Sequence, residues 1–453
     1  MSALDAIDTI VLVMLENRSF DHMLGHLSYG RYANGTDVDG ITAPLKRDAW
    51  ANVFQGEPYY PFAMRDRQLS GDLPHDRGAI ATQLHRSAVT GTYAMDGFAK
   101  SYFAASPLNR TTKPDPLGFL LPGDVPMTRF LADNYAVCDR WFASLPAGTQ
   151  PNRLMAWTGT SYIDGNGFLP PHDPLVIDWL ERSGVRWRVY TSGLSFFLLL
   201  GATAAFGPNF RGIDRLAPDV VGEQPGDFPQ VIVVEPLYGD AARIVGGIPN
   251  DDHAPAPVGP GELFLRKVYD ALTRNPARWA RTLLVVTYDE HGGFWDHVSP
   301  PPIPYAPPAR ATYTKAFESL GVRVPGLVVS PLVSPKRVSH EILDHTSVLQ
   351  LLAEKFTPGI PFSPAVETRR QSGIASVSAV LDLAAPRADV PIAPDFSITV
   401  EMPLGENRPP ATPLEGTFEE AAFDMVRKFP KPTAQKYPEV SHWVLTQEDR
   451  PHG

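Results

Sequence analysis

The sequence predicts an α/β protein in which helices cover both faces of a mostly parallel β-sheet. Short runs rich in valine, isoleucine and leucine alternate with segments of helical periodicity, as in a parallel sheet with crossover helices. Hydrophobic residues make up 43% of the 453 residues and charged residues only 20%, so the chain can bury a large core. Polar residues follow three of the apolar runs, at the sheet edge where ligands bind.

Five apolar runs are expected to form buried parallel strands. In chain order they span residues 7–15, 185–191, 230–235, 282–288 and 324–330. Helical patterns fall between them, at residues 128–134, 152–158, 174–182, 261–275 and 346–355. No run approaches the roughly 20 apolar residues that a bilayer requires, so we expect no transmembrane segment.

Two stretches depart from this alternation. Residues from about 30–126 are polar, turn-rich and dotted with aromatic side chains, and we expect them to form an insertion that covers the active face as a lid. Beyond residue 384, prolines recur before one amphipathic candidate helix at 418–428; they are Pro386, Pro391, Pro394, Pro403, Pro409, Pro410 and Pro413. We therefore expect a catalytic domain over residues 1–384 and a C-terminal extension, 385–453, that packs on this domain.

Charge and cysteine content narrow the functional classes. Forty lysines and arginines against fifty acids give a net charge of −10 without long runs of one sign, which argues against a nucleic-acid partner. The single cysteine, Cys138, cannot form an intramolecular disulfide. With no signal peptide in the first residues, we expect a cytoplasmic protein, and export by another route stays open. The oligomeric state is also open.

The first polar motif, Glu16-Asn17, directly follows the first strand. A carboxylate and an amide at a strand's carboxyl end can give two oxygens to a hard cation. The alternative is a strand-to-helix turn in which Asn17 or Ser19 caps the helix.

The second motif surrounds Thr149. Pro146, Gly148 and Pro151 predict a tight turn, and Pro151 suits the first position of a helix. The Thr149 hydroxyl would then lie at a helix N-terminus, where partial positive charge stabilises a phosphate or an alkoxide. The alternative is that Thr149 only caps the helix.

The third motif is the most informative. Five titratable groups follow a buried strand within nine residues: Asp289, Glu290, His291, Asp296 and His297. Adjacent acids repel each other unless a cation or a proton lies between them. Gly292 and Gly293 allow the backbone to reverse toward the strand end.

Two smaller pairs and one loop histidine follow the same logic. Asp252-His253 and Asp344-His345 each place an acid beside a histidine, and an acid sets the histidine's tautomer and raises its basicity. Asp344-His345 could instead only cap the helix that follows. His75, in Asp72-Leu73-Pro74-His75, is not distinctive alone.

Taken in order, these motifs resemble the bacterial phosphoesterase family that unites phospholipases C with acid phosphatases. The blocks are E-N-R-S-F-D-H, P-A-G-T-Q-P-N-R, D-D-H-x-P and Y-D-E-H-G-G-F-W-D-H, with D-H-T-S as a closing block. The resemblance runs from Leu15 to Phe356 and implies an alkaline-phosphatase-like three-layer α/β/α core.

The resemblance also implies a site, position by position. One divalent metal ion (Ca, Mg, Mn or Zn) would be held by Glu16, Asn17, Thr149, Asp289 and Glu290. Thr149 would also be the nucleophile, and the histidines around the phosphate would be His75, His253 and His297. Supporting roles would fall to Asp252, Asp296 and His291.

The implied activity is hydrolysis of phosphodiesters, phosphatidylcholine-like or related, through a phosphothreonine. Thr149 and the Asp289-Glu290 pair are similar to the phospholipase C branch, since the acid-phosphatase branch tends to carry serine and a second aspartate. The alternatives are an acid phosphatase acting on phosphomonoesters and an inactive ligand-binding homologue. The substrate would be a small-molecule or lipid phosphoester.

Overall fold

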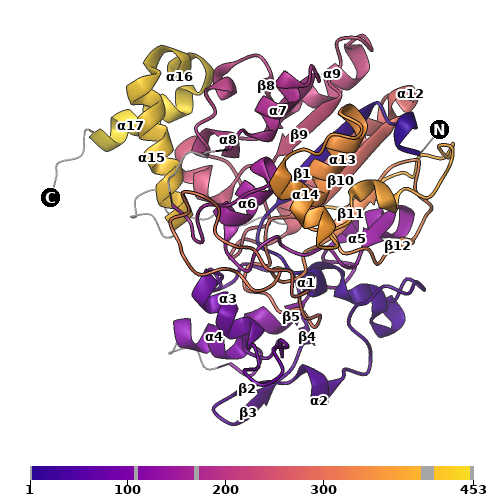
Figure 1. The fold of residues 1–453 in the computed structure, drawn as a ribbon, viewed down its shortest axis with the longest axis vertical. Coiled ribbons are helices and arrows are strands. Elements are labelled where there is room, and N and C mark those ends of the chain that lie inside the picture. Colours follow the sequence, from indigo (N-terminus) through magenta and orange to yellow (C-terminus); the bar gives the residue numbers. More distant parts are fainter. Residues whose placement is uncertain (1–2, 107–110, 168–172, 399–412, 449–453) are drawn as a thin grey trace.

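The computed structural model describes residues 3–106, 111–167, 173–398 and 413–448. Its main sheet has eight strands in the order β12-β6-β11-β10-β1-β9-β7-β8 (Figure 1). The strands are β1 (Thr9–Leu15), β6 (Ala136–Cys138), β7 (Trp187–Thr191), β8 (Phe210–Gly212), β9 (Val231–Glu235), β10 (Thr282–Tyr288), β11 (Gly326–Val329) and β12 (Arg337–Ser339). All five expected strands are present, which confirms the α/β fold class.

The centre of the sheet is parallel and fully buried. β1 pairs in parallel with both β10 and β9, and its seven residues are all buried. In this register Leu15 lies opposite Tyr288, so the residues that follow β1 and β10 emerge side by side.

The expected direction of the strand at 324–330 is wrong. β11 runs antiparallel to β10 and to β6. A parallel pair needs a crossover that carries the chain back across the sheet, usually as a helix. The connection from Asp289 to Pro325 is described throughout and contains no helix, so β11 begins at the edge where β10 ends.

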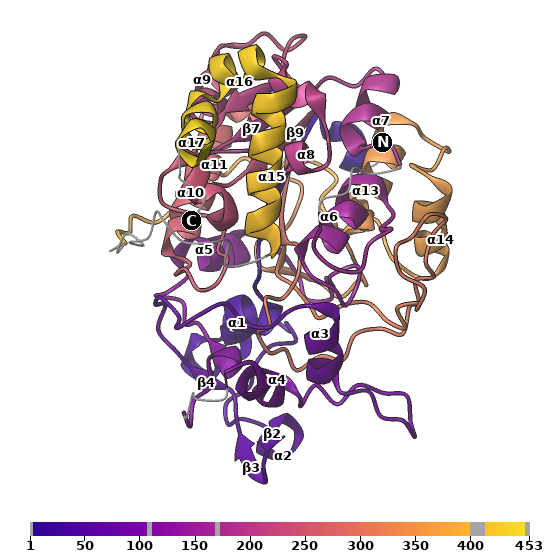
Figure 2. The same cartoon turned by 90° about the vertical axis from the view of Figure 1, so that its left-hand side faces the viewer.

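Helices cover both faces of the sheet, which confirms the three-layer arrangement. In Figure 2, one side carries α5 (Pro126–Asn134), α9 (Leu216–Gly222) and α11 (Gly259–Thr273). The other side carries α6 (Thr149–Thr158), α7 (Val176–Arg182), α13 (Thr346–Phe356) and α14 (Pro364–Gln371). The five expected helices correspond to α5, α6, α7, α11 and α13.

The insertion forms one end of the molecule (Figure 1). Its helices and strands are α2 (Arg47–Trp50), β2 (Asn52–Phe54), β3 (Glu57–Tyr59), β4 (Phe62–Ala63), α3 (Arg77–Leu84), α4 (Phe98–Ala105) and β5 (Gly118–Phe119). The short helix α1 (Phe20–Leu24) comes just before the insertion in the chain. Ring contacts join the insertion to the loop after β10: between centroids, Trp50 lies 5.8 Å from Trp295 and 5.2 Å from His297, and Phe98 lies 6.0 Å from His291. The insertion therefore packs directly on the loop that carries the third motif.

The described part of the C-terminal extension contains three helices where the sequence predicted one. They are α15 (Pro413–Lys428), α16 (Pro430–Lys436) and α17 (Pro438–Glu448), and each begins with a proline. Proline suits the first turn of a helix, so these prolines mark helix starts. Pro403, Pro409 and Pro410 lie outside the described residues.

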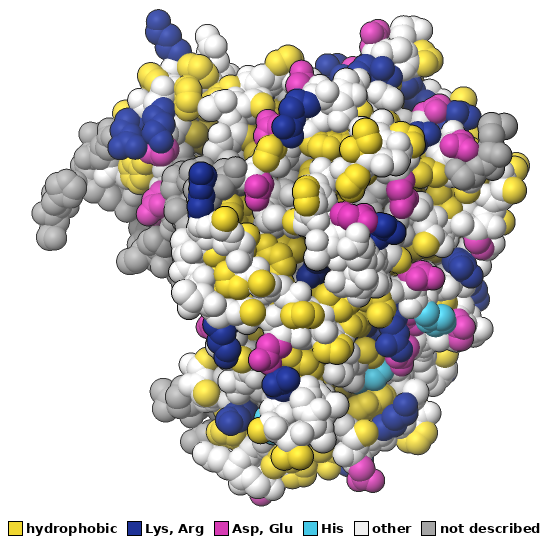
Figure 3. Space-filling model, in the orientation of Figure 1, with side chains coloured by type: hydrophobic (Ala, Val, Ile, Leu, Met, Phe, Trp, Pro, Cys, Tyr) yellow, Lys and Arg dark blue, Asp and Glu magenta, His cyan; other side chains and the backbone are white. Residues whose placement is uncertain are grey.

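The distribution of charge on the surface agrees with the absence of long single-sign runs in the sequence. The helices also agree with the sequence, whose apolar runs are short. On the face in Figure 3, acidic and basic side chains are interspersed among apolar and uncharged ones. Within the described ranges, no helix combines the length and hydrophobicity needed to cross a bilayer.

Candidate active site

The first motif forms a strained turn at the end of β1. Asn17 has a φ of 64°, in the left-handed region, and its buried side chain has no hydrogen-bond partner among the described residues. The loop after β10 presses against this turn. A Cβ on Gly292, whose φ is 60°, would lie 2.1 Å from the backbone oxygen of Asn17, so only glycine fits there.

The two acids after β10 lie beside this turn. Asp289 Oδ1 accepts hydrogen bonds from the backbone N–H of Asn17, at 3.2 Å, and of Glu290, at 2.7 Å. Asp289 and Glu290 are fully buried, as is Glu16. In the part of the chain that the structure describes, Oε1 of Glu290 has no hydrogen-bond partner.

Thr149 lies at the N-terminus of α6, as predicted. It is itself the first helical residue, however, so the expected first position of Pro151 is wrong: Pro151 is the third residue, and the N-cap residue is Gly148. The turn before it is held by Asn152, whose side-chain amide donates to the carbonyls of Leu145 and Ala147 at 3.1 and 2.8 Å. Thr149 is fully buried, yet its hydroxyl has no partner within the described ranges. The turn thus presents an unsatisfied hydroxyl at a helix N-terminus.

Arg153, one turn further along α6, ties this helix to the strand ends. Its Nη2 lies 3.0 Å from Glu16 Oε1, and its Nε lies 3.1 Å from Asp289 Oδ2. Because residues four apart share a helix face, Thr149 lies on the face that meets the two carboxylates. We call Glu16, Asn17, Thr149, Asp289 and Glu290 the Thr149 site.

Arg153 is a site residue that the sequence analysis passed over. Arg153 is the last residue of the motif P-A-G-T-Q-P-N-R, but the motif itself does not indicate which acids the arginine pairs with. The available signal was its spacing of four residues from Thr149, together with a cationic residue on a helix otherwise free of charge. A buried arginine between two buried acids keeps the carboxylates close together despite their repulsion.

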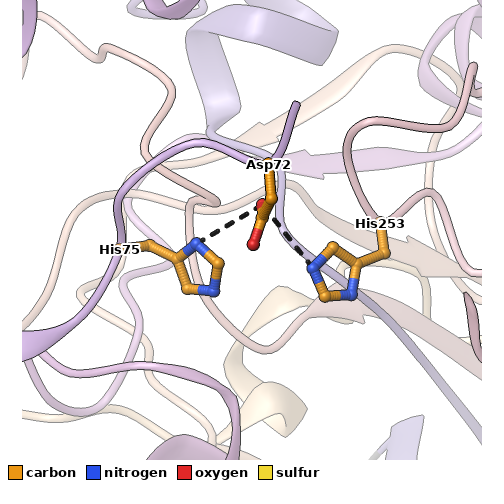
Figure 4. A group of neighbouring side chains, drawn as sticks. All are labelled: Asp72, His75 and His253. Carbon is orange, nitrogen blue, oxygen red and sulfur yellow. Dashed lines mark ion pairs between the residues drawn. The ribbon is translucent and has the colours of Figure 1, made fainter. Parts of the chain in front are cut away.

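His75 and His253 flank Asp72 (Figure 4). The Asp72 carboxylate lies 3.7 Å from His75 Nδ1 and 3.8 Å from His253 Nε2. His253 Nδ1 lies 2.9 Å from Glu16 Oε2 and 3.3 Å from Asp240 Oδ2. The structure therefore places His253 in contact with Glu16 of the Thr149 site. Asp72 and Asp240, which the sequence did not predict as site residues, both contact His253.

His75 reaches the same region through its loop. A Cβ on Gly148 would lie 3.6 Å from the backbone oxygen of His75, and one on Gly293 would lie 2.8 Å from that of Pro74. The loop thus touches both the turn before Thr149 and the turn after Glu290.

Charge governs the protonation of these groups. Burial disfavours charged His75, but Asp72 and Glu290 outweigh it and raise its pKa to about 9. Burial raises the pKa of Asp289 to about 6, and Arg153 opposes this rise. Burial would also raise the pKa of Glu290, yet His75 holds it below its usual range. The region thus contains a charged histidine beside an ionised carboxylate.

Two of the predicted supporting residues sit in the surrounding packing. Asp252 accepts a hydrogen bond from the Tyr288 hydroxyl at 2.6 Å, and burial raises its pKa well above the usual value. His291 donates from Nε2 to Gln83 Oε1 at 2.8 Å, and burial lowers its pKa. His291 is therefore neutral and anchors the turn after Glu290.

Asp296 and His297 belong to a second group. His297 places Nδ1 2.6 Å from Asp21 and Nε2 3.0 Å from Asp39. Asp296 pairs with Arg323 at 3.0 Å, and Arg323 also reaches Asp21 at 3.2 Å. We call these five residues the His297 cluster. Among the residues that the structure describes, no hydrogen bond or ion pair joins it to the Thr149 site.

His345 lies behind the site. Its Nε2 donates to the backbone oxygen of Asp289 at 2.7 Å. Asp344 precedes the N-cap residue of α13, which is His345, and accepts from the backbone N–H of Thr346 at 2.8 Å. It also pairs with Arg369, so it does more than hold the start of the helix.

The Thr149 site fits a divalent cation. Its unpartnered atoms are the Thr149 hydroxyl, the Asn17 side chain and Glu290 Oε1, and a buried polar atom without a partner is costly. Oxygen donors of this kind suit hard cations. Among the described residues, three further groups have the geometry to hold a metal ion. One overlaps the Thr149 site, one adjoins it through His253 and one belongs to the His297 cluster; they are Glu16, Asp240 and His253; Asp72, His75 and His253; and Asp21, Asp296 and His297.

The fold and these contacts define a class of protein: an α/β enzyme whose polar groups gather at the carboxyl edge of parallel strands, beside a threonine at a helix N-terminus. The chain belongs to the Phosphoesterase family, whose model matches residues 7–358. It is therefore a phosphoric ester hydrolase, as the sequence predicted.

Named relatives match most of the chain. Non-specific phospholipase C3 of Arabidopsis thaliana is 30% identical over 86% of this chain and 76% of its own length. Phospholipase C B of Mycobacterium tuberculosis is 31% identical over 84% and 78%. A solved murine ectonucleotide pyrophosphatase/phosphodiesterase 5 covers 57% of this chain and 95% of its own at 12% identity, with a TM-score of 0.36.

Proposed function

We propose that the protein is a metal-dependent phosphodiesterase of the phospholipase C type that acts through a phosphothreonine at Thr149. The names of the relatives at 30% and 31% identity support the substrate class. The observation that carries the proposal is the unsatisfied, buried hydroxyl of Thr149 beside the unsatisfied side chains of Asn17 and Glu290.

The proposed cation would be held by the oxygens of Glu16, Asn17, Thr149, Asp289 and Glu290. When bound, it would favour the alkoxide of Thr149 and balance the charge of the phosphoryl oxygens. Arg153 keeps Glu16 and Asp289 at fixed positions for this purpose. The N-terminus of α6 adds partial positive charge where the phosphate would lie.

In the first step, Thr149 Oγ1, in the alkoxide form that the cation would favour, attacks phosphorus, and the bond from phosphorus to the alcohol oxygen breaks. The departing oxygen takes a proton from a charged histidine. His75 and His253 are the candidates, because neighbouring carboxylates raise the pKa of each above its usual value.

In the second step, water attacks the phosphothreonine. The histidine that gave up its proton is now neutral and accepts one from this water, while the bond from phosphorus to Thr149 breaks. The products are the alcohol from the first step and a phosphomonoester, and Thr149 returns to the alkoxide that began the cycle. The histidine ends protonated, so the cycle closes without another reactant.

The insertion contributes fewer exposed aromatic rings than its sequence offers. Phe98, Tyr102 and Phe103 are buried, and Arg47 already lies over the Tyr60 ring at 4.8 Å. Tyr59 and Tyr93 are half-buried. A choline-type head group would have these two rings available for a cation–π contact.

A substrate panel tests the proposal. Phosphatidylcholine, glycerophosphocholine and simple phosphomonoesters are compared at fixed metal concentration, with and without chelator. We expect the diesters to have the higher kcat/KM. If monoesters win by about tenfold, or about 1.4 kcal/mol in transition-state binding, the acid-phosphatase alternative replaces this assignment.

A further inference from the structure

The C-terminal extension lies outside the residues that the family model matches, yet it packs beside the Thr149 site. The match ends at residue 358, and α15 begins at Pro413. Figure 2 shows α15 alongside α8 (Phe196–Leu199). It also contacts the short helix Gly239–Ala241, which follows β9.

One residue of α15, Phe418, points into this interface. It is fully buried, and its ring centroid lies 5.8 Å from that of Tyr238 and 6.2 Å from that of Phe196. Phe196 and Tyr238 are themselves 5.8 Å apart. The three rings therefore form a closed triangle, two from the core and one from the extension, at distances typical of favourable aromatic pairs.

The two core rings of this triangle hold Arg153. The guanidinium carbon lies 4.6 Å from the Phe196 centroid and 4.9 Å from the Tyr238 centroid. Arg153 Nη1 also donates to the Tyr238 hydroxyl at 3.1 Å. Since Arg153 is buried and pairs with Glu16 and Asp289, the rings set where it meets these carboxylates.

Glu235, at the end of β9, fixes one side of the two rings. Its Oε1 accepts from the backbone N–H of Phe196 at 3.0 Å and from the Tyr238 hydroxyl at 3.3 Å. Glu235 therefore ties the backbone of Phe196 and the hydroxyl of Tyr238 to the end of β9. Phe418 is the ring that closes the triangle from the extension.

We propose that Phe418 is a positioning residue for the Thr149 site: it holds the rings of Phe196 and Tyr238, which hold Arg153 between Glu16 and Asp289. The proposal rests on the proposed function, because the carboxylates that Arg153 orients are the proposed cation ligands. It assigns the C-terminal extension a part in assembling the site.

The test uses Mn²⁺ as the probe. Full-length protein is stripped with chelator, dialysed and titrated with Mn²⁺ by calorimetry, as wild type, as Phe418→Ala and as Phe423→Ala. Phe423 lies on the same helix but is 39% exposed and contacts Trp443, away from the triangle. We expect Phe418→Ala to weaken Mn²⁺ binding about tenfold and Phe423→Ala to leave it unchanged.

A purely structural role would give a different result. Thermal unfolding without metal is measured in parallel, and a Phe418→Ala protein that melts earlier but binds Mn²⁺ like wild type overturns the proposal. If Phe418→Ala does not fold, Phe418→Leu takes its place, because leucine fills most of the space without the ring; it should weaken binding about threefold. If wild type does not bind Mn²⁺, the same titrations are made with Ca²⁺, Mg²⁺ and Zn²⁺. Wild type that binds none of the four would refute the proposed function, and this inference with it.

Discussion

The same two motifs build two groups of opposite character. The block around Glu16 gives Glu16 and Asn17 to the Thr149 site but Asp21 to the His297 cluster. The block around Asp289 gives Asp289 and Glu290 to the first and Asp296 and His297 to the second. Each motif thus joins a group with unpartnered polar atoms to a group whose charges are paired.

We infer from this difference that the Thr149 site binds the reacting groups, whereas the His297 cluster holds two parts of the fold together. In the Thr149 site, atoms of Thr149, Asn17 and Glu290 are buried without partners, so a ligand would gain the interactions that the chain leaves unmade. In the His297 cluster, both ring nitrogens of His297 already face carboxylates, and Arg323 pairs with two acids. Such a cluster joins the insertion, through Asp39, to the loop after β10.

Removal of metal should have the largest effect. Chelation followed by dialysis should abolish phosphodiesterase activity, because the charges of the Thr149 site and the substrate would no longer be balanced. Adding back one of Mg²⁺, Ca²⁺, Mn²⁺ or Zn²⁺ should restore it. Full activity in a sample verified as metal-free by elemental analysis would contradict the proposed cation.

Replacing the nucleophile comes next. Thr149→Ala should lower kcat by about a thousandfold or more while the protein stays folded, since it removes only the attacking oxygen. Thr149→Ser should keep part of the activity because serine supplies the same oxygen. Thr158→Ala, at the other end of α6, is the control, and equal losses in both alanine variants would argue against a special role for Thr149.

A variant of the second group should change activity far less. Burial disfavours charged His297, but Asp21 and Asp39 outweigh it and raise its pKa to about 9. An arrangement already filled by two carboxylates leaves no ring nitrogen for a phosphate. We therefore expect His297→Gln to lower kcat by less than about tenfold. A thousandfold loss would instead favour the catalytic role that the family resemblance implies.

The same variant should alter how stability depends on pH. A histidine whose pKa is raised on folding stabilises the protein fully below its unfolded pKa of about 6.5, and this contribution is lost as pH rises through about 9. The free energy of unfolding of the wild type should exceed that of His297→Gln by at most on the order of 3 kcal/mol near pH 6. The difference should be smaller at pH 9. Urea unfolding at both values measures this; a difference independent of pH would contradict the charged pairing.

The central strands and their polar ends could be predicted because they depend on local pattern. β1 and β10 are continuous apolar runs, and burial on both faces requires such runs. The turn after β10 could also be predicted, because Gly292 and Gly293 allow the backbone to reverse there. In the structure Gly292 indeed has no room for a side chain. Thr149 at the start of α6 followed from the placement of Pro151.

Other features depend on how distant segments meet. The direction of β11 is set by the long helix-free connection before it, and its apolar residues are the same in either direction. Arg153 gains its meaning only when α6 packs on β1 and β10. Phe418 belongs to a segment more than 160 residues from its partners Phe196 and Tyr238, and an amphipathic pattern does not name the surface that it covers.

The most direct test of the account is the mass of the protein during turnover. A reaction with a phosphodiester substrate is quenched in the burst phase, and intact-mass analysis is followed by peptide mapping. If Thr149 is the nucleophile, a single phosphoryl-type adduct should appear on the peptide that contains Thr149. The adduct should be absent from Thr149→Ala and from the chelated enzyme. Active enzyme that shows no adduct under burst conditions would contradict it and point to direct attack by water.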